Sequence, residues 1–227
     1  MSRPPFNLQA VEAVTPLALS SGHHVMQTHY YAETPQAHVG LLLDWLNPPA
    51  NAVVLDAGCG IGEVSRLMAE ARPDLAFVLV NISPLQLSLC PDGERFLRVC
   101  ADCHDMTDIA DASVQAVMFS SALCQMDTAV ALAEASRVLA PHGILLINDM
   151  VRTGADGERI EQTLAARVLT QTELIRFVDE AGFTIDLATA PEGSDAHFRE
   201  LLAKAGIEDI IEGITPFVIR ATKRGRS

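Results

Sequence analysis

Short apolar runs alternate with amphipathic segments through most of the chain. Apolar runs bounded by turn residues are typical of buried strands, and apolar residues three or four apart are typical of helices. The pattern predicts strands at residues 52–55, 76–80, 96–100, 114–119, 144–148, 183–187 and 214–222. It predicts helices at residues 63–72, 83–89, 128–139, 170–181 and 197–205. Because strands and helices alternate, we expect an α/β fold built from βαβ units around a largely parallel sheet.

The first part of the chain has a different pattern. Up to about residue 49 no segment looks like a strand, whereas residues 36–46 look helical, with one apolar face made by Val39, Leu42, Leu43 and Leu46. We therefore expect residues 1–49 to form a helical cap segment and residues 50–227 to form one domain. A chain of 227 residues is long enough for this organisation.

Charge narrows the range of partners. The formal net charge is −13, and the dense basic run at residues 223–226 reads as a solvated tail. Nucleic-acid binding normally needs a basic patch. No apolar run reaches the roughly 18–20 residues that cross a bilayer, and residues 1–5 do not begin a secretory signal. We expect a cytoplasmic protein that acts on a small molecule, with no nucleic-acid or membrane partner; a homodimer is left open.

Five cysteines, an odd number, in a chain without an export signal indicate reduced thiols. Cys100-Ala101-Asp102-Cys103-His104 matches the C-x-x-C-H pattern of c-type haem attachment, but that attachment would need an export route. A zinc site would need a second pair of ligands, and none lies at suitable spacing. We favour a buried strand residue at Cys100, a loop residue at Cys103, and no metal site.

A glycine-rich loop, Asp56-Ala57-Gly58-Cys59-Gly60-Ile61-Gly62, follows the first predicted strand. Ligands of open α/β sheets bind at the carboxyl ends of the strands, and glycines let the backbone turn sharply and approach a ligand closely. The anion at Asp56 would repel the pyrophosphate of a dinucleotide such as NAD. S-adenosylmethionine carries an ammonium and a sulfonium and no phosphate, so Asp56 favours it over a dinucleotide.

Leu55 to Gly62 resembles motif I of the class I S-adenosylmethionine-dependent methyltransferases, and the similarity extends from about residue 50 to residue 150. The resemblance implies a Rossmann-like, seven-stranded sheet of order 3-2-1-4-5-7-6 with strand 7 antiparallel. Residues 82–86 further resemble the branch that includes sterol, geranyl diphosphate and cyclopropane-fatty-acid methyltransferases. The resemblance to the class implies S-adenosylmethionine as the cofactor.

The resemblance also places cofactor-binding residues. Asn81 stands where the family usually has an acid for the ribose hydroxyls, Gln86 would help to hold the ribose, and Asp102 would accept from the adenine amino group. Ser120 and Ser121 would lie near the methionine half. The full cofactor-binding set expected is Tyr31, Asp56, Gly58, Cys59, Gly60, Gly62, Asn81, Ile82, Gln86, Asp102, Cys103, Ser120 and Gln125.

The substrate side is less distinctive. Residues 28–33 are similar to the His-His-Tyr-Gly segment of terpenoid C-methyltransferases, which makes His29 and Tyr30 candidate catalytic residues. Asp149 follows the fifth strand and is a candidate base, and Arg152 beside it is a candidate anion ligand or a salt-bridge partner. Ser121 stands where the sterol enzymes have an acid, so a sterol-type mechanism does not transfer directly.

These patterns predict a methyltransferase of a small lipophilic or isoprenoid-like metabolite, acting at carbon. An O- or N-methyltransferase of a small natural product, and a cofactor-binding homologue with a non-methylating reaction, are the alternatives. A dinucleotide-dependent enzyme is a further alternative that Asp56 disfavours.

Overall fold

The computed structural model describes Leu8, Thr15 and residues 31–154, 157–164, 166–204 and 208–225. The two candidate catalytic residues His29 and Tyr30 lie outside the described residues. Among the residues described, no helix is both long enough and apolar enough to cross a membrane.

The core of the fold is a seven-stranded sheet of order β3-β2-β1-β4-β5-β7-β6. The strands are β1 (Val53–Ala57), β2 (Ala76–Asn81), β3 (Phe96–Cys100), β4 (Val114–Ser120), β5 (Leu139–Arg152), β6 (Phe183–Thr189) and β7 (Ile214–Lys223). All neighbouring pairs are parallel except those of β7, which runs antiparallel to both β5 and β6. The predicted fold class, strand order and orientation of the last strand are confirmed.

The fifth strand is longer than its predicted range of 144–148. It begins at Leu139, and the residues between the predicted helix and the predicted strand form a bulge inside the strand. The register moves from Val114 opposite Leu139 to Ala116 opposite Ile144, so β5 has three extra residues there. The strand continues to Arg152 because β7 pairs with it along that whole stretch. A partner that is distant in the sequence supplies hydrogen bonds that a local pattern does not reveal.

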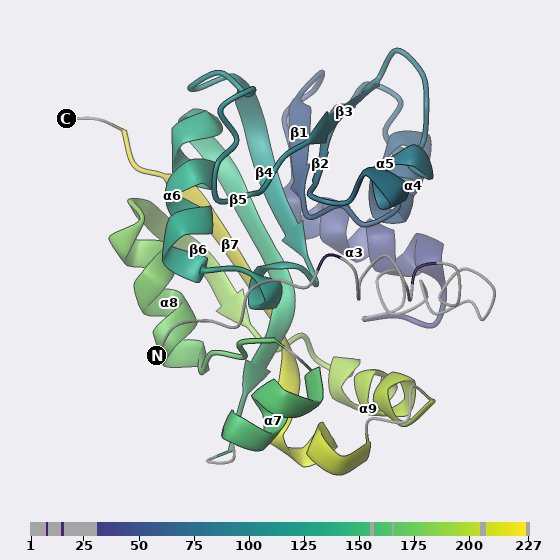
Figure 1. Cartoon of the computed structure of the whole chain (residues 1–227), viewed down its shortest axis with the longest axis vertical. Helices are drawn as coiled ribbons and strands as arrows, with labels where there is room; N and C mark the ends of the chain where they lie inside the picture. The colour runs from purple at the N-terminus through teal and green to yellow at the C-terminus, as the bar shows by residue number, and fades with distance from the viewer. Residues whose placement is uncertain are drawn as a thin grey trace.

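Helices cover both faces of the sheet (Figure 1). The α-helices are α3 (Pro35–Leu46), α4 (Glu63–Ala71), α5 (Pro84–Ser88), α6 (Thr128–Val138), α7 (Gly157–Leu164), α8 (Gln171–Glu180) and α9 (Ser194–Lys204). Short 3-10 helices are η1 (Leu123–Gln125) and η2 (Glu208–Gly213). The pattern did not predict α7, which buries a single side chain, Ile160.

The two faces have separate apolar cores. One core joins α3, α4, α5 and α9 to one side of the sheet, and the other joins α6 and α8 to the opposite side. In Figure 1, α6 and α8 lie together on one flank, and α4 and α5 lie beside β1–β3. The three layers bury the parallel strands on both faces, which explains their near-continuous apolar runs.

Local capping sets where the helices near the sheet edge begin. The Ser83 side chain caps α5 by accepting from the Gln86 N–H, and Pro84 occupies the first helical turn. Thr170 and Glu173 form a reciprocal capping box at the start of α8. These caps hold the strand-to-helix connections at the carboxyl edge of the sheet, where a ligand would bind.

Candidate cofactor and acceptor site

The glycine loop joins β1 to α4 in a conformation that requires glycine. Gly58, Gly60 and Gly62 have φ values of 76°, 58° and 74°, which are left-handed. A Cβ on Gly58 would lie 2.8 Å from the Cβ of Ala122. The backbone N–H groups of Gly58 and Cys59 both donate to the carbonyl oxygen of Val80, at 2.9 and 3.0 Å. The loop is therefore tied to the end of β2 and packed closely against the segment that follows β4.

Asp56 is a buried carboxylate directly before this loop. Its side chain is 2% exposed, and its Oδ2 accepts from the Ser65 hydroxyl at 2.6 Å. Burial raises the pKa of Asp56 to about 6, while the hydrogen bond from Ser65 lowers it. No cationic side chain among the described residues pairs with Asp56. The site thus holds a desolvated acid that a cationic ligand would stabilise in its ionised form.

The raised pKa of Asp56 predicts a specific pH dependence of stability. The folded state keeps the Asp56 proton up to about pH 6, whereas an unfolded aspartate loses its proton near its ordinary pKa of 3.8. The protonated Asp56 side chain therefore contributes fully to stability below pH 3.8, and this contribution is lost as the pH rises through 6. The full loss is about 3 kcal/mol in the free energy of unfolding.

Denaturant unfolding of the cofactor-free protein at pH 4 and pH 7 measures this loss. Burial also raises the pKa of Asp149, so the wild type must be compared with Asp56→Asn at each pH. We expect the stability difference between the two proteins to change by about 2 kcal/mol between these pH values, because Asp56 in the unfolded chain is already partly ionised at pH 4. An equal pH dependence in both proteins would contradict the assignment.

Asn81 connects the end of β2 to the glycine-rich loop at residues 56–62 (the cofactor loop). Its Nδ2 donates to the Gly60 carbonyl at 3.0 Å and to Gln86 Oε1 at 2.8 Å, and its Oδ1 accepts from the Ser83 N–H at 2.9 Å. Gln86 Nε2 in turn donates to the Thr15 hydroxyl at 3.1 Å. A carboxylate could not donate to the Gly60 carbonyl, which is a physical reason for an amide at a position where the family usually has an acid.

The C-x-x-C-H segment after β3 forms a hydrogen-bonded loop. Asp102 Oδ1 accepts from the His104 N–H at 2.9 Å and lies 2.7 Å from His104 Nδ1. His104 Nε2 accepts from the Asp127 N–H at 2.8 Å. Cys100 ends β3 as expected but is exposed and not buried, because β3 is the edge strand of the sheet, whereas Cys103 is buried. Both are free thiols. Within the described part of the chain, no three potential ligands come together to hold a metal ion.

Polar atoms without partners among the described residues lie just after the end of β4 and at the neighbouring position on β5. Asn148 Nδ2 donates to the Ser120 hydroxyl at 3.0 Å, and the Ser121 N–H donates to the Asn148 carbonyl at 2.7 Å. Among the described residues, Ser121 Oγ and Asn148 Oδ1 are buried without a hydrogen-bond partner. Unpaired buried polar atoms are costly, so a bound ligand is a natural partner for them. The sequence analysis missed Asn148, although its signal was a polar residue at the end of an apolar run.

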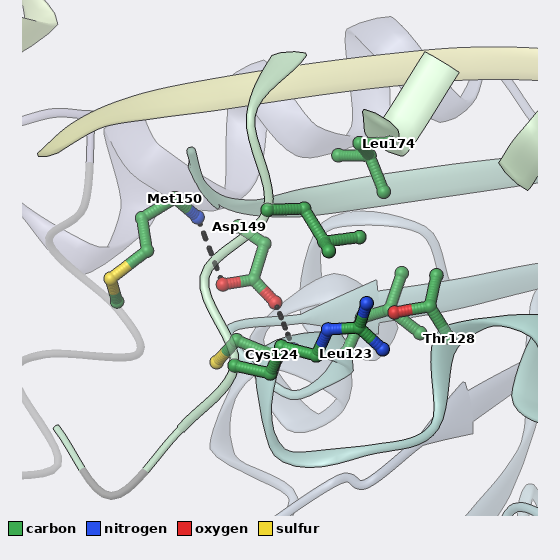
Figure 2. Close-up of a pocket in the computed structure, with 8 residues that line it drawn as sticks. Leu123, Cys124, Thr128, Asp149, Met150 and Leu174 are labelled. Atoms are coloured by element: carbon green, nitrogen blue, oxygen red, sulfur yellow. Dashed lines mark hydrogen bonds between the residues drawn. The ribbon is translucent and has the colours of Figure 1, made fainter. Parts of the chain in front are cut away.

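Asp149 lines a pocket beside this edge (Figure 2). It is 3% exposed, and its oxygens accept from the N–H groups of Cys124 at 3.0 Å and Met150 at 2.8 Å. Burial raises the pKa of Asp149, although these hydrogen bonds oppose the rise. The pocket is a small hollow with a cavity volume of about 10 Å³, and about 240 Å³ when the open solvent at its mouth is included. It is lined by Leu123, Cys124, Thr128, Asp149, Met150, Arg167, Leu169 and Leu174.

The segment containing η1 separates the pocket from the cofactor loop. Ala122 and Met126 are the side chains nearest to the position that a Cβ on Gly58 would occupy. Leu123 and Cys124, between them in the chain, line the pocket. Gln125, expected to bind the cofactor, is half-buried in the same short helix. One short segment therefore contacts both the loop and the pocket, which places the two sites next to each other.

Tyr31 and Arg152 are engaged by other protein groups. The Tyr31 hydroxyl donates to the Phe217 carbonyl at 3.2 Å, and its ring makes an edge contact with Trp45. Arg152 Nη2 lies 3.2 Å from Glu173 Oε2, so Arg152 forms the salt bridge that was one of its two expected roles. The contact of Tyr31 with the cofactor stays a prediction.

These features suit S-adenosylmethionine. The glycine loop has a left-handed conformation that only glycine adopts readily, Asp56 offers a buried carboxylate, and Ser121 and Asn148 present unpaired polar atoms near the carboxyl end of β4. An ammonium group would satisfy an acid and such acceptors without the phosphates that Asp56 would repel.

Comparisons with known proteins identify a methyltransferase domain in part of the chain. Residues 55–147 match the family model described as a methyltransferase domain. A malonyl-[acyl-carrier protein] O-methyltransferase from Alcanivorax borkumensis is 33% identical over 98 residues, and the match covers 41% of this chain and 33% of that protein. The chain therefore spans about a third of the length of this curated relative.

Solved structures share the fold over most of the chain. The [4+2]-cyclase SpnF superposes with a TM-score of 0.82 at 20% identity, covering 100% of this chain and 99% of SpnF. A geranyl diphosphate C-methyltransferase from Streptomyces coelicolor A3(2) superposes with a TM-score of 0.74 at 16% identity, covering 84% and 79% of the two chains. A geranyl diphosphate methyltransferase solved in complex with S-adenosylmethionine superposes with a TM-score of 0.73 at 18% identity, covering 84% of this chain and 86% of that chain. The chain therefore contains a region, residues 55–147, that matches a methyltransferase domain, and its seven-stranded sheet has the fold of these solved structures.

Proposed function

We propose that the protein methylates a small lipophilic, isoprenoid-like metabolite at carbon. The observation that carries the proposal is the pocket beside the cofactor loop, which has aliphatic walls and one buried carboxylate, Asp149. Leu123, Leu169 and Leu174 offer the apolar surface that a hydrocarbon chain prefers. Arg167, which also lines the pocket, is exposed and would suit an anionic end of the same acceptor.

The chemistry assigns a role to Asp149. The cofactor supplies a methyl group that is already activated on a sulfonium, so the protein mainly provides proximity, orientation and exclusion of water. Methyl transfer to an alkene carbon leaves a cation that must release a proton, which requires a nearby base. Burial raises the pKa of Asp149 and makes its carboxylate a stronger base. His29 and Tyr30 remain proposed catalytic residues on sequence grounds.

The known relatives support more than one acceptor. One curated relative is named for O-methylation of malonyl-[acyl-carrier protein], and structural neighbours are named for C-methylation of geranyl diphosphate. We favour the second class because the pocket is mainly aliphatic and lies beside a base that O-methylation of a carboxylate would not need. We also propose that residues 1–49 cap the site and that the protein works in the cytoplasm, without nucleic acid, given its net charge of −13.

Incubation with methyl-labelled cofactor tests this function. Geranyl diphosphate and a crude metabolite extract serve as acceptor sources, and mass spectrometry detects labelled products and S-adenosylhomocysteine. We expect a labelled lipophilic product with a new carbon–carbon bond. For Asp149→Asn we expect turnover to fall about 100-fold or more, because a general base contributes on this order, with cofactor affinity retained.

The exposed acid Asp108 provides a matched control, since Asp108→Asn removes a carboxylate outside the pocket. It should retain wild-type turnover. A labelled product methylated at oxygen or nitrogen would contradict the proposed carbon chemistry. Unchanged turnover in Asp149→Asn would exclude Asp149 as the base.

A second candidate function is a ring-forming reaction that leaves the cofactor intact. The specific observation is the superposition with a [4+2]-cyclase over 100% of this chain and 99% of the cyclase. The same experiment separates the two functions. An acceptor that is converted without label and without release of S-adenosylhomocysteine would support the second function and exclude the first.

A further inference from the structure

Two thiols lie in contact beneath the cofactor loop. The sulfur atoms of Cys59 and Cys90 are 3.9 Å apart, and the two residues are only 6% and 4% exposed. Cys59 belongs to the loop itself, whereas Cys90 lies just beyond α5. A disulfide needs the sulfur atoms at about 2.05 Å. To form a bond, the two sulfur atoms must move from 3.9 Å to this distance by side-chain rotation and a local shift of the loop.

Both thiols hydrogen-bond to the same carbonyl oxygen of the loop. Gly60 O lies 3.5 Å from Cys90 Sγ and 3.6 Å from Cys59 Sγ, and it also accepts from Asn81 Nδ2 at 3.0 Å. Cys90 Sγ is also 3.2 Å from the position that a Cβ on Gly62 would occupy. The thiol pair is therefore part of the packing that sets the shape of the loop.

The two thiols differ in acidity. The hydrogen bond from Cys59 and the charge of Arg98 lower the pKa of Cys90, against the opposing effect of burial. The pKa of Cys59 is raised well above its usual range by that same hydrogen bond and by burial. The guanidinium of Arg98 lies next to Cys90 and donates to the Pro91 carbonyl at 3.1 Å. The thiolate is the form of cysteine that reacts with an oxidant, so Cys90 is the better candidate for the first attack and Cys59, in contact with it, for the second.

We propose that Cys59 and Cys90 form a reversible disulfide that lowers the affinity of the protein for S-adenosylmethionine. The oxidant is a hydroperoxide, of which hydrogen peroxide is the simplest. The Cys90 thiolate attacks one peroxide oxygen, the O–O bond breaks, and a sulfenic acid and hydroxide form; the hydroxide takes up the Cys90 proton as water. The Cys59 sulfur then attacks the Cys90 sulfur, and the S–O bond breaks. Water leaves with the Cys59 proton, so that two thiols and one peroxide give one disulfide and two waters.

The expected loss of affinity follows from how the loop is held. Closing the disulfide pulls Cys59 towards α5 and removes both S–H donors from the Gly60 carbonyl. The loop cannot follow as a rigid unit, because Gly58 is packed against Ala122 and its N–H is bonded to the Val80 carbonyl. The backbone near the cofactor must therefore distort. This inference rests on the cofactor assignment alone and holds for any methyl acceptor.

Cofactor binding to reduced and oxidised protein tests the proposal. The full chain is treated with hydrogen peroxide, the excess is removed, and the affinity for S-adenosylmethionine is measured by calorimetry before and after a dithiol reductant. We expect a loss of at least tenfold that the reductant reverses, and a Cys59–Cys90 cross-linked peptide in the digest. Unchanged affinity in protein that carries this cross-link would overturn the proposal, as would a loss of affinity without the cross-link.

Single cysteine variants provide matched controls, each compared with itself before and after peroxide. Cys90→Ser should show no change in affinity, whereas Cys100→Ser, which removes an exposed thiol, should respond as the wild type does. A tenfold loss in Cys90→Ser would contradict the pairing.

The reduction potential of the Cys59–Cys90 pair can be measured on the wild-type protein, so this test does not depend on the folding of a variant. Binding linkage is reciprocal, so saturating cofactor should favour the reduced pair by the same factor. A tenfold effect corresponds to a reduction potential about 30 mV higher in the presence of cofactor. A potential that does not change with cofactor would overturn the proposed coupling.

Discussion

Replacing Asp56 by Asn should weaken binding of S-adenosylmethionine about 100-fold while the fold is retained. Asp56 is 2% exposed and, in the ligand-free protein, holds a single hydrogen bond to Ser65. The amide keeps the shape of the side chain but removes the charge that would meet a cationic ligand. Losing one partner of a buried charge pair typically costs about 3 kcal/mol, which corresponds to roughly 100-fold in affinity. Calorimetric titration at pH 7 measures the change.

A second acid close in sequence controls for the general effect of charge. Glu63 begins α4, is partly exposed and pairs with Arg66 at 2.6 Å. Glu63→Gln removes the same formal charge without touching the buried carboxylate, so its cofactor affinity should stay within threefold of the wild type. If Asp56→Asn is folded and binds as tightly as Glu63→Gln, the carboxylate does not select the cofactor, and the glycine backbone carries the recognition.

Adding a single methyl group at Gly58 should damage both stability and cofactor binding. Gly58 has a φ of 76°, a conformation that costs an L-residue about 1–2 kcal/mol. The new Cβ of Gly58→Ala would also lie 2.8 Å from the Cβ of Ala122, so the loop or the segment after β4 must move. We expect a loss of about 2 kcal/mol or more in the free energy of unfolding, and cofactor affinity reduced about 100-fold. Denaturant unfolding and calorimetry measure the two effects.

The chain offers both a control and a rescue for this variant. Gly40 lies inside α3, and a Cβ there would have no heavy atom within 4 Å. Gly40→Ala should therefore stabilise the protein by about 0.5–1 kcal/mol. Adding Ala122→Gly to Gly58→Ala removes the clash but leaves the backbone strain, so it should restore part of the lost affinity. A double variant no better than Gly58→Ala would show that steric contact with Ala122 is not the cause.

Much of the sheet could be predicted because its signals are local. The buried runs of β1, β2 and β4 are nearly continuous in apolar residues, and turn residues bound them. The same is true of the caps at Ser83 and Thr170, where a hydroxyl satisfies an N–H a few residues away. The strand order came from the resemblance of Leu55–Gly62 to a known motif, because periodicity says which segments are strands but not which strands are neighbours.

Other parts of the structure depend on contacts between distant residues. The extension of β5 to Arg152 needs β7, which pairs with it from more than sixty residues further along the chain. Helix α7 carries one buried side chain, Ile160, and so shows little periodicity of its own. Arg152 was a candidate ligand for an anion, yet Glu173 at the start of α8 binds it. In each case the partner is supplied by the fold and not by the neighbouring sequence.

For the cofactor loop, some properties follow from the sequence alone and others only from the tertiary structure. The sequence by itself determined the residues of the loop, Asp56 to Gly62, and the preference for a cationic over a phosphorylated ligand, because glycine's access to left-handed conformations and the charge of a carboxylate are properties of single residues. Tertiary structure decided that Asp56 is buried with a raised pKa, that Asn81 donates to the Gly60 carbonyl, and that Cys90 touches Cys59. Burial, hydrogen-bond partners and the contact of two thiols depend on distances between segments, and only packing of the whole chain sets those distances.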